Sequence, residues 1–420
     1  MSATKMAGHD ASISGGIPST WKVKSLGQVA TECKVRNNAK VDDKLLCGVL
    51  KNQGLAPMRE RVKGVSTDRC KVVAPNAFAY NPMRLNIGSI ARNKNQHAVM
   101  VSPDYVVFET DTLQLLPIYL DQVRRSGLWE RYVGASGDGS VRVRIYYEDL
   151  ARFEFPIPPI PEQQKIAAIL TAVDDQLDVI CRQIASTRTL KQGLMQTLFS
   201  REVSTCDSNE WPIVPLCDVA EVRTGVAKGK KELKEPVQLP YLRVANVQDT
   251  LIDLREVKMI EIEATQVARY SLQPGDVLMT EGGDFDKLGR GGVWKGQISP
   301  CLHQNHVFAV RPAPDKLNPD YLAALAASDY GRKYFLSCAK RTTNLASINS
   351  SQLKAFPVLL PSLSVQSEIA TVVDAINAKI AVLEEKQATQ KILKRGLMQK
   401  LLTGEWRVAL GAQQEVALAA

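Results

Sequence analysis

Apolar residues recur at alternating steps of four and three in two long segments of the chain. This 3.5-residue spacing is typical of a helix that keeps an apolar seam against a partner helix. The first segment follows Pro158 and Pro161 and the second follows Pro361, and proline is tolerated only in the first turn of a helix. Each segment is about 38 residues long, which predicts a rod of roughly 55 Å. The apolar seam positions are Ile166, Leu170, Val173, Leu177, Ile180, Ile184, Leu194 and Leu198, and then Ile369, Val373, Ile376, Ile380, Leu383, Leu397 and Leu401.

The two helical segments are copies of one another, 203 residues apart. The stretch LKQGLMQTLFSRE at 190–202 matches LKRGLMQKLLTGE at 393–405 at eight of thirteen positions. The offset holds without a gap from Phe153 and Phe356 to the ends of these stretches, and a weaker echo links Trp21 to Trp211. Two unrelated core helices would not repeat their seam at a fixed offset, so we interpret the chain as an internal duplication.

The duplication alternates variable and repeated segments. Domain ends commonly lie close together, so the second helix would start where the first ends and run antiparallel to it, with an approximate two-fold axis relating the halves. The predicted parts are an N-terminal tail 1–20, a domain 21–152, a helical spacer 153–210, a domain 211–355, a spacer 356–408 and a C-terminal tail 409–420.

The two variable segments share a coarse α+β order. Each begins with a short element, at Leu26 and Val29 or at Leu216 and Val219. We expect strands at 241–244 and 276–280, and paired strands at 97–109 and 301–312, where apolar and polar residues alternate. One helix is then predicted at 115–132 and at 319–335, followed by a polar loop at 136–144 or 339–347.

Composition and charge narrow the class of protein. With 45% hydrophobic and 23% charged residues the chain resembles an ordinary soluble protein, no apolar run reaches membrane-spanning length, and the eight scattered cysteines suit a reducing cytoplasm. The net charge is +9. Residues 21–150 hold 20 basic and 13 acidic side chains (+7), and residues 211–355 hold 19 and 16 (+3). Positive charge therefore gathers in the variable segments, which favours a polyanionic partner such as nucleic acid over a neutral one.

No pattern of catalytic residues stands out. The methyltransferase loop of Asn, Asp or Ser followed by two prolines and an aromatic residue is missing, and Asn81-Pro82-Met83-Arg84 is interpreted as a turn or a DNA-facing loop. The acidic run with Glu281, Asp284, Asp286 and Lys287 lies among glycines and is weak evidence for a metal site. Cys301, His303 and His306 lack a fourth ligand at a zinc-finger spacing, and we expect no metal and no cofactor to bind this chain.

The motifs resemble those of the specificity subunit of type I restriction–modification enzymes. The resemblance is carried by KQGLMQTLFS and KRGLMQKLLTGEWRV, by PIPPIPEQQKIAAIL, and by LQPGDVLMTEGGDFDKLGRGG and NPMRLNIGSI, and it covers residues 17–408. Residues 362–366 lack the prolines and the Glu-Gln-Gln of the first copy, which leaves the start of the second helix open.

The resemblance implies two target-recognition domains separated by antiparallel helices. Such a subunit has no active site and reads a bipartite site on double-stranded DNA. It holds two methyltransferase subunits, which bind S-adenosylmethionine, and a restriction–translocation subunit where the system has one. The alternative is a coiled-coil scaffold without sequence-specific binding, which the charge of the two domains disfavours.

Candidate DNA contacts are the basic and amide side chains of the polar loops, because base edges and phosphates are read by such groups. For any single residue, an ordinary solvated surface position is an equally good interpretation. The candidates are Arg59, Arg61, Lys63, Arg84, Arg92, Lys94, Arg142, Arg144, Lys228, Lys230, Lys231, Lys287, Arg290, Lys340, Arg341, Thr343 and Asn344.

Overall fold

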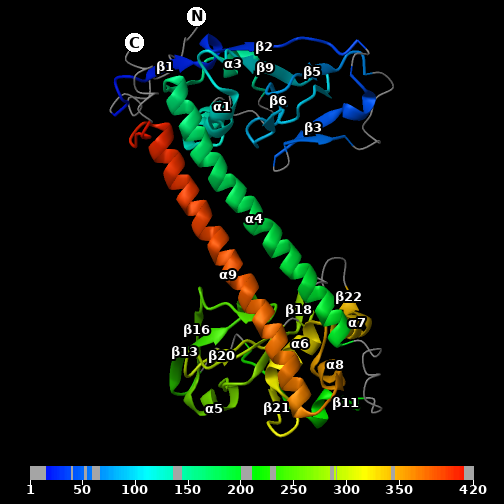
Figure 1. Ribbon diagram of the computed structural model, residues 1–420. Helices are drawn as coiled ribbons and strands as arrows, with labels where there is room; N and C mark the ends of the chain where they lie inside the picture. Colours follow the sequence, from blue (N-terminus) through cyan, green and yellow to red (C-terminus); the bar gives the residue numbers. More distant parts are fainter. Residues whose placement is uncertain are drawn as a thin grey trace, which may run out of the picture. The chain divides into compact units, whose positions relative to one another are not determined.

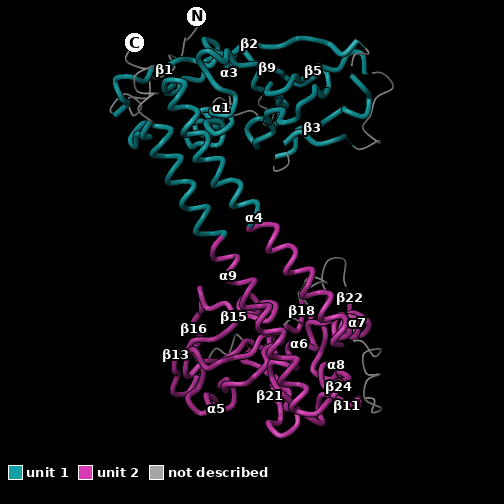
Figure 2. Tube along the Cα trace, in the orientation of Figure 1, with its two compact units in different colours: residues 1–179, 387–420 teal, residues 180–386 magenta. Residues whose placement is uncertain are grey.

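The computed structural model divides the chain into two compact units, which are coloured separately in Figure 2. Unit 1 comprises residues 1–179 and 387–420, and unit 2 comprises residues 180–386. The structure describes residues 16–38, 41–51, 54–58, 67–135, 144–199, 211–227, 233–283, 288–289, 291–341 and 346–410. Each unit is an α+β domain that contains part of both long helices, α4 (Ile160–Leu198) and α9 (Leu363–Leu402) (Figure 1).

Unit 1 is built on a four-stranded antiparallel sheet with the order β2-β9-β6-β7. Its strands are β2 (Ala30–Glu32), β9 (Val106–Thr110), β6 (Phe78–Tyr80) and β7 (Ile90–Arg92). One face packs on the helices, where Phe78 and Phe108 stack with ring centroids 5.1 Å apart. The other elements are β1 (Lys22–Ser25), η1 (Leu26–Gln28), η2 (Asp43–Leu45), β3 (Cys47–Leu50), β4 (Gly54–Pro57), β5 (Lys71–Val73), β8 (Val99–Val101), α1 (Pro117–Val123), α2 (Gly127–Ala135), α3 (Tyr147–Leu150) and β10 (Glu154–Ile157).

Unit 2 repeats this plan with the sheet order β12-β21-β17-β19. Its strands are β12 (Ala220–Thr224), β21 (Val307–Pro312), β17 (Val277–Thr280) and β19 (Gly291–Val293). The other elements are β11 (Ile213–Pro215), η5 (Leu216–Asp218), β13 (Pro236–Leu242), η6 (Val244–Asn246), β14 (Val247–Gln248), β15 (Leu251–Ile252), β16 (Lys258–Glu263), η7 (Ala264–Gln266), α5 (Val267–Tyr270), β18 (Gly282–Gly283), β20 (Leu302–His303), α6 (Pro319–Ala327), α7 (Asp329–Cys338), β22 (Lys340–Arg341), β23 (Ala346–Ser347), α8 (Ser350–Lys354) and β24 (Pro357–Leu359).

Equivalent hydrogen bonds recur in the two units although few side chains are shared. The Leu26 N–H donates to Phe153 O in unit 1, and the Leu216 N–H donates to Phe356 O in unit 2. These bonds extend the antiparallel ribbons β1–β10 and β11–β24. The Trp21 echo in the sequence therefore marks a real structural repeat, and the α+β duplication is confirmed.

Each helix expected after the sheet is in fact two helices, so the single helices predicted at 115–132 and 319–335 are wrong. The chain turns at Ser126 between α1 and α2, and at Ser328 between α6 and α7. Both serine hydroxyls donate 2.6 Å bonds to a carbonyl three residues back, at Val123 and Leu325. The Ser328 hydroxyl also accepts from the Gly331 N–H, and such side-chain bonds to the backbone favour a helix start.

The strand predictions hold in part. Residues 97–109 form β8 and β9, but β8 pairs with β5 and β9 with β2 and β6, so these strands are not partners of one another. Residues 301–312 likewise form β20 and β21 on either side of a turn, and β20 pairs with β13. The predicted strand 276–280 is present as β17, whereas β13 ends at Leu242 and residues 244–246 form a 3-10 turn. Buried strands do not alternate strictly between apolar and polar residues, so the sequence pattern does not show which strands pair.

One buried glutamine fastens each domain to its long helix. The Gln163 side chain accepts from the Leu116 N–H and donates to Gln114 O and Pro158 O, each at 2.8 Å. In unit 2 the Gln366 side chain accepts from the Asn318 N–H at 2.8 Å and donates to Lys316 O at 3.0 Å and Pro361 O at 2.9 Å. The second helix, whose start the sequence leaves open, therefore begins at Leu363 with the same anchoring residue.

The long helices run antiparallel within each unit. In unit 1, Asp174 pairs with Lys394 and Gln176 with Gln390, so partners move backward along α9 as they move forward along α4. In unit 2, the Arg188 guanidinium lies 2.6 Å from the Glu384 carboxylate. The seam residues are buried or half-buried, while most of the positions between them are exposed.

Candidate DNA-recognition surface

In unit 1 the structure brings two predicted basic segments together beyond the central strand β6. Residues 81–84 form a turn in which the Arg84 N–H donates to Asn81 O at 3.0 Å and the Met83 N–H donates to the Asn81 side chain at 2.9 Å. The Ile145 N–H donates to Pro82 O at 3.1 Å, which fastens the segment that carries Arg144 to this turn. Arg84 and Arg144 are both exposed. The turn interpretation of residues 81–84 is confirmed, and two candidate cations share one edge of the domain.

Unit 2 makes the same connection with different residues. The Ile348 N–H donates to Glu281 O at 2.8 Å, directly after β17. Strand β18 then pairs with β23, and β23 with β22, so the glycine-rich segment and the polar loop form one small sheet. A Cβ on Gly282 would lie 3.0 Å from Ala346 O, which is closer than an ordinary van der Waals contact. This sheet carries the exposed Lys340.

The remaining candidates are placed as follows. Lys94 is exposed beyond the end of β7, and the backbone of Arg341 belongs to β22. The other candidates lie outside the described residues: Arg59, Arg61, Lys63, Arg142, Lys228, Lys230, Lys231, Lys287, Arg290, Thr343 and Asn344. Their roles as DNA contacts stay predictions.

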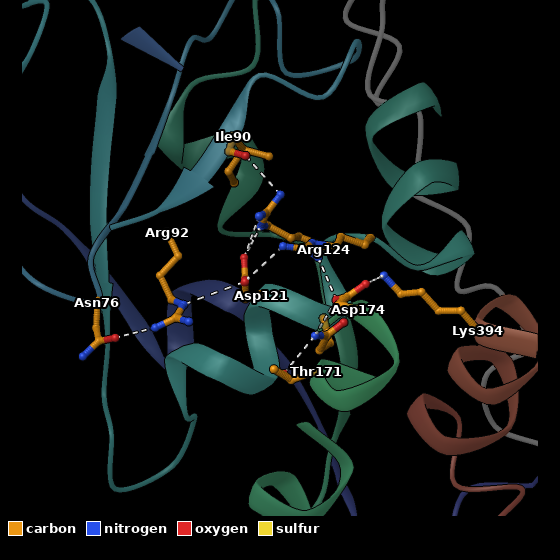
Figure 3. A network of polar contacts seen from close by, with 10 residues as sticks. Asn76, Ile90, Arg92, Asp121, Arg124, Thr171, Asp174 and Lys394 are labelled. Carbon is orange, nitrogen blue, oxygen red and sulfur yellow. Dashed lines mark hydrogen bonds and ion pairs between the residues drawn. The ribbon is translucent and has the colours of Figure 1, made fainter. Parts of the chain in front are cut away.

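Arg92 is held by neighbouring side chains (Figure 3). Its side chain is 14% exposed, lies 3.9 Å from the Asp121 carboxylate and donates a 2.5 Å bond to the Asn76 side chain. These contacts hold the side chain at the end of β7, while its buried Nε has no hydrogen-bond partner among the described residues. The role of Arg92 as a DNA contact stays a prediction.

Arg92 belongs to a polar network that links the domain of unit 1 to both long helices (Figure 3). Asp121 on α1 accepts from Arg124 and Arg125, and Arg125 also reaches Asp174 on α4, at 3.0 Å. Asp174 in turn pairs with Lys394 on α9. Burial alone would raise the pKa of Asp121, but the adjacent Arg124 and Arg125 outweigh it and hold the pKa below its usual value. Sequence analysis did not predict this network, because it joins residues that lie far apart in the chain.

The structure describes some of the residues considered as metal ligands. His303 is buried and its Nδ1 lies 2.6 Å from Val307 O, while burial lowers its pKa and favours the neutral ring. His306 lies in the turn between β20 and β21, and its Nδ1 lies 2.5 Å from the Glu281 carboxylate. The described parts of the chain contain no group of three or more His, Cys, Asp or Glu residues placed to hold a metal ion. Asp284, Asp286 and Lys287 lie outside the described residues.

Comparison with known proteins identifies the family. The family model of the type I restriction–modification DNA specificity domain matches the chain twice, at residues 18–186 and 208–393. The chain is 29% identical over 196 residues to the MjaX specificity subunit of Methanocaldococcus jannaschii, a match that covers 46% of each chain. It is 23% identical over 394 residues to the EcoKI specificity subunit of Escherichia coli K12, covering 90% of this chain and 81% of the relative.

Two solved structures share the fold. The S subunit of the type I system from M. genitalium superposes with a TM-score of 0.58 at 14% identity, over 92% of this chain and 97% of that one. A chain from a study of complex assembly in a type I restriction–modification system gives 0.54 at 20% identity, over 93% and 99%. The protein belongs to the family of type I restriction–modification DNA specificity subunits, and it is a DNA-recognition subunit rather than an enzyme.

Proposed function

We propose that this subunit reads an asymmetric DNA site in two parts, with one half-site for each unit, and that it holds two methyltransferase subunits. The observation that carries the first part is the repeated sheet with different residues beyond its central strand. In each unit, exposed basic residues lie near a hydrogen bond that joins two segments, from Ile145 to Pro82 in unit 1 and from Ile348 to Glu281 in unit 2. The joined segments differ between the units in length and in sequence. Two domains with the same sheet and different candidate DNA-contact residues suit two different half-sites.

The second part of the proposal rests on the duplication of the long helices. A binding surface that occurs twice in one chain suits two copies of the same partner. S-adenosylmethionine would then bind to the methyltransferase subunits. Where the system has a restriction–translocation subunit, that subunit would bind to the complex. Among the described residues, no helix is both long and apolar enough to cross a membrane. The setting proposed for this assembly is the cytoplasm.

A salt titration of DNA binding tests the position of the surface in unit 2. Replacing Lys340 and Arg341 together by Ala should weaken binding of the cognate duplex and reduce the slope of log K against log salt by roughly one to two units, because each lost phosphate contact releases about one counterion fewer. Lys354, a basic residue on α8, serves as the control and should leave the slope unchanged when replaced by Ala. An unchanged slope in the Lys340→Ala, Arg341→Ala variant would exclude β22 from the contact surface.

A coiled-coil scaffold without sequence preference remains the competing function. It predicts equal affinity for cognate and scrambled duplexes at one salt concentration, whereas the proposed function predicts a large difference. Competition binding with both duplexes separates the two.

A further inference from the structure

A short turn joins β20 to β21 in unit 2 and carries polar side chains on the surface. The turn is closed by a 2.8 Å bond from the Val307 N–H to Gln304 O, with Asn305 and His306 at its two central positions. His306 is exposed, and Gln304 and Asn305 are half-buried. In the described part of the chain, the side-chain amides of Gln304 and Asn305 form no hydrogen bond. Contacts within the domain therefore do not account for an amide at either position.

The backbone of the turn does not require these residue types. Unit 1 contains the same turn between β8 and β9, closed by a 3.0 Å bond from the Tyr105 N–H to Ser102 O, with a proline and an aspartate at the centre. Neither Asn305 nor His306 has a positive φ angle. The fold keeps the turn while its central side chains change, as expected of residues that read different bases.

Two backbone hydrogen bonds attach the turn to segments that carry candidate DNA contacts. On one side, the Asn305 N–H donates to Val226 O at 2.9 Å, and a lysine-rich segment follows directly in the chain. On the other side, the Glu281 N–H donates to His306 O at 3.0 Å, directly before β18 of the small sheet with Lys340. The turn therefore lies between basic residues that are suited to phosphate contacts.

Gly225 holds the turn close to β12. A Cβ on this residue would lie 2.1 Å from His303 O and 2.5 Å from Gln304 O, so a larger residue would displace the turn. Base readout needs side chains held within about 0.5 Å of their working position, which a turn packed on a strand provides better than a long loop.

The chemistry of the two central side chains fits base edges better than phosphates. The His306 Nδ1 lies 2.5 Å from the Glu281 carboxylate, which can only accept, so Nδ1 carries the hydrogen and Nε2 is an acceptor in the neutral ring. The Asn305 amide offers both a donor and an acceptor. Base edges in the major groove present donors and acceptors, whereas phosphate oxygens only accept.

We propose that Asn305 and His306 read base edges in the half-site of unit 2, with Glu281 as the positioning residue that orients His306. This inference rests on the proposed function and adds the residues that set base preference. They lie outside the basic loops, so affinity and base preference depend on different side chains: Lys340 and its neighbours hold phosphates, and the turn discriminates between bases.

The test measures base preference at every position of the site. The complex of the full chain with its methyltransferase subunit is mixed with duplexes in which each cognate position is randomised in turn, and bound and unbound DNA are sequenced. Asn305→Ala and His306→Ala should each lower discrimination about tenfold at one or two adjacent positions of a single half-site, the size of a good base contact. The slope of log K against log salt should match the parent, because no phosphate contact is lost.

Two further variants test the chemistry without emptying the turn. Asn305→Asp keeps the shape of the side chain but removes its donor, so it should disfavour the parent's base at the position affected by Asn305→Ala. Glu281→Ala should lower discrimination at the position affected by His306→Ala, and the double variant should lose no more than His306→Ala alone, because Glu281 acts through His306.

Gln273→Ala is the matched control. Gln273 is also exposed and lies in a turn of unit 2, but it precedes β17 at the end opposite Glu281, so its variant should keep the parent's preference at every position. A parent complex that bound cognate and scrambled duplexes equally would refute the proposed function. A parent that reads its site, with variants at Asn305 and His306 that keep its preference at every position, would overturn the inference about the turn. A uniform loss of affinity with a smaller salt slope, a loss in the other half-site, or an equal loss in Gln273→Ala would overturn it as well.

Discussion

Gln163→Leu should lower the free energy of unfolding of unit 1 by about 2–4 kcal/mol. A leucine of similar size leaves one buried and two part-buried backbone groups without a partner, and a fully buried group costs about 1–3 kcal/mol. Gln163 is fully buried, and its three bonds reach Gln114 O, Pro158 O and the Leu116 N–H. Gln366→Leu should have a similar effect on unit 2. Hydrogen exchange of the peptides at 114–120 and 316–322 reports each unit separately.

The control for this prediction is the next residue in the chain. Gln164 is exposed, so Gln164→Leu changes the same side chain without breaking a buried bond. It should leave hydrogen exchange at 114–120 unchanged. Equal protection in the Gln163→Leu and Gln164→Leu proteins would mean that the glutamine does not fasten the domain to its helix.

Ile180→Asp should destabilise the helix pair by about 3–5 kcal/mol, the range measured when a buried charge is left without a partner. Ile180 is 3% exposed and belongs to the seam, and Leu383→Asp places a charge at the equivalent seam position of α9. Ala185→Asp, on the exposed side of α4, is the matched control and should melt close to the parent. Thermal unfolding followed by circular dichroism at the helix band is the measurement. A variant at Ile180 that melts like the parent and binds DNA normally would contradict the buried seam.

The long helices and the duplication could be predicted because both are written in periodic patterns. An apolar residue every 3.5 positions has few physical explanations besides a pair of packed helices. The offset of 203 residues between the two copies stays constant even where their side chains differ. The glutamine anchor was also within reach, since Gln366 stands 203 residues after Gln163. The prolines that residues 362–366 lack obscure this equivalence.

The details inside each domain were harder to predict because they depend on contacts between distant segments. Serine is a residue type that favours a helix start, but Ser126 and Ser328 alone do not show that a helix ends just before them. The pairing of Arg92 with Asp121 and Asn76 could not be predicted, because it joins residues that are far apart in the chain. The sequence also does not show that the segments of Arg84 and Arg144 lie together, because this depends on the hydrogen bond from the Ile145 N–H to Pro82 O.

Methylation mapping after exchange of one domain tests the central claim most directly. Residues 211–355 would be replaced by the second domain of another specificity subunit, and the chimera would be produced in a host together with the methyltransferase subunit of this system. Sequencing that detects methylated bases then gives both half-sites and the spacer for parent and chimera. The account predicts that one half-site changes while the other half-site and the spacer stay the same. A chimera that altered both half-sites would contradict the assignment of one half-site to each unit.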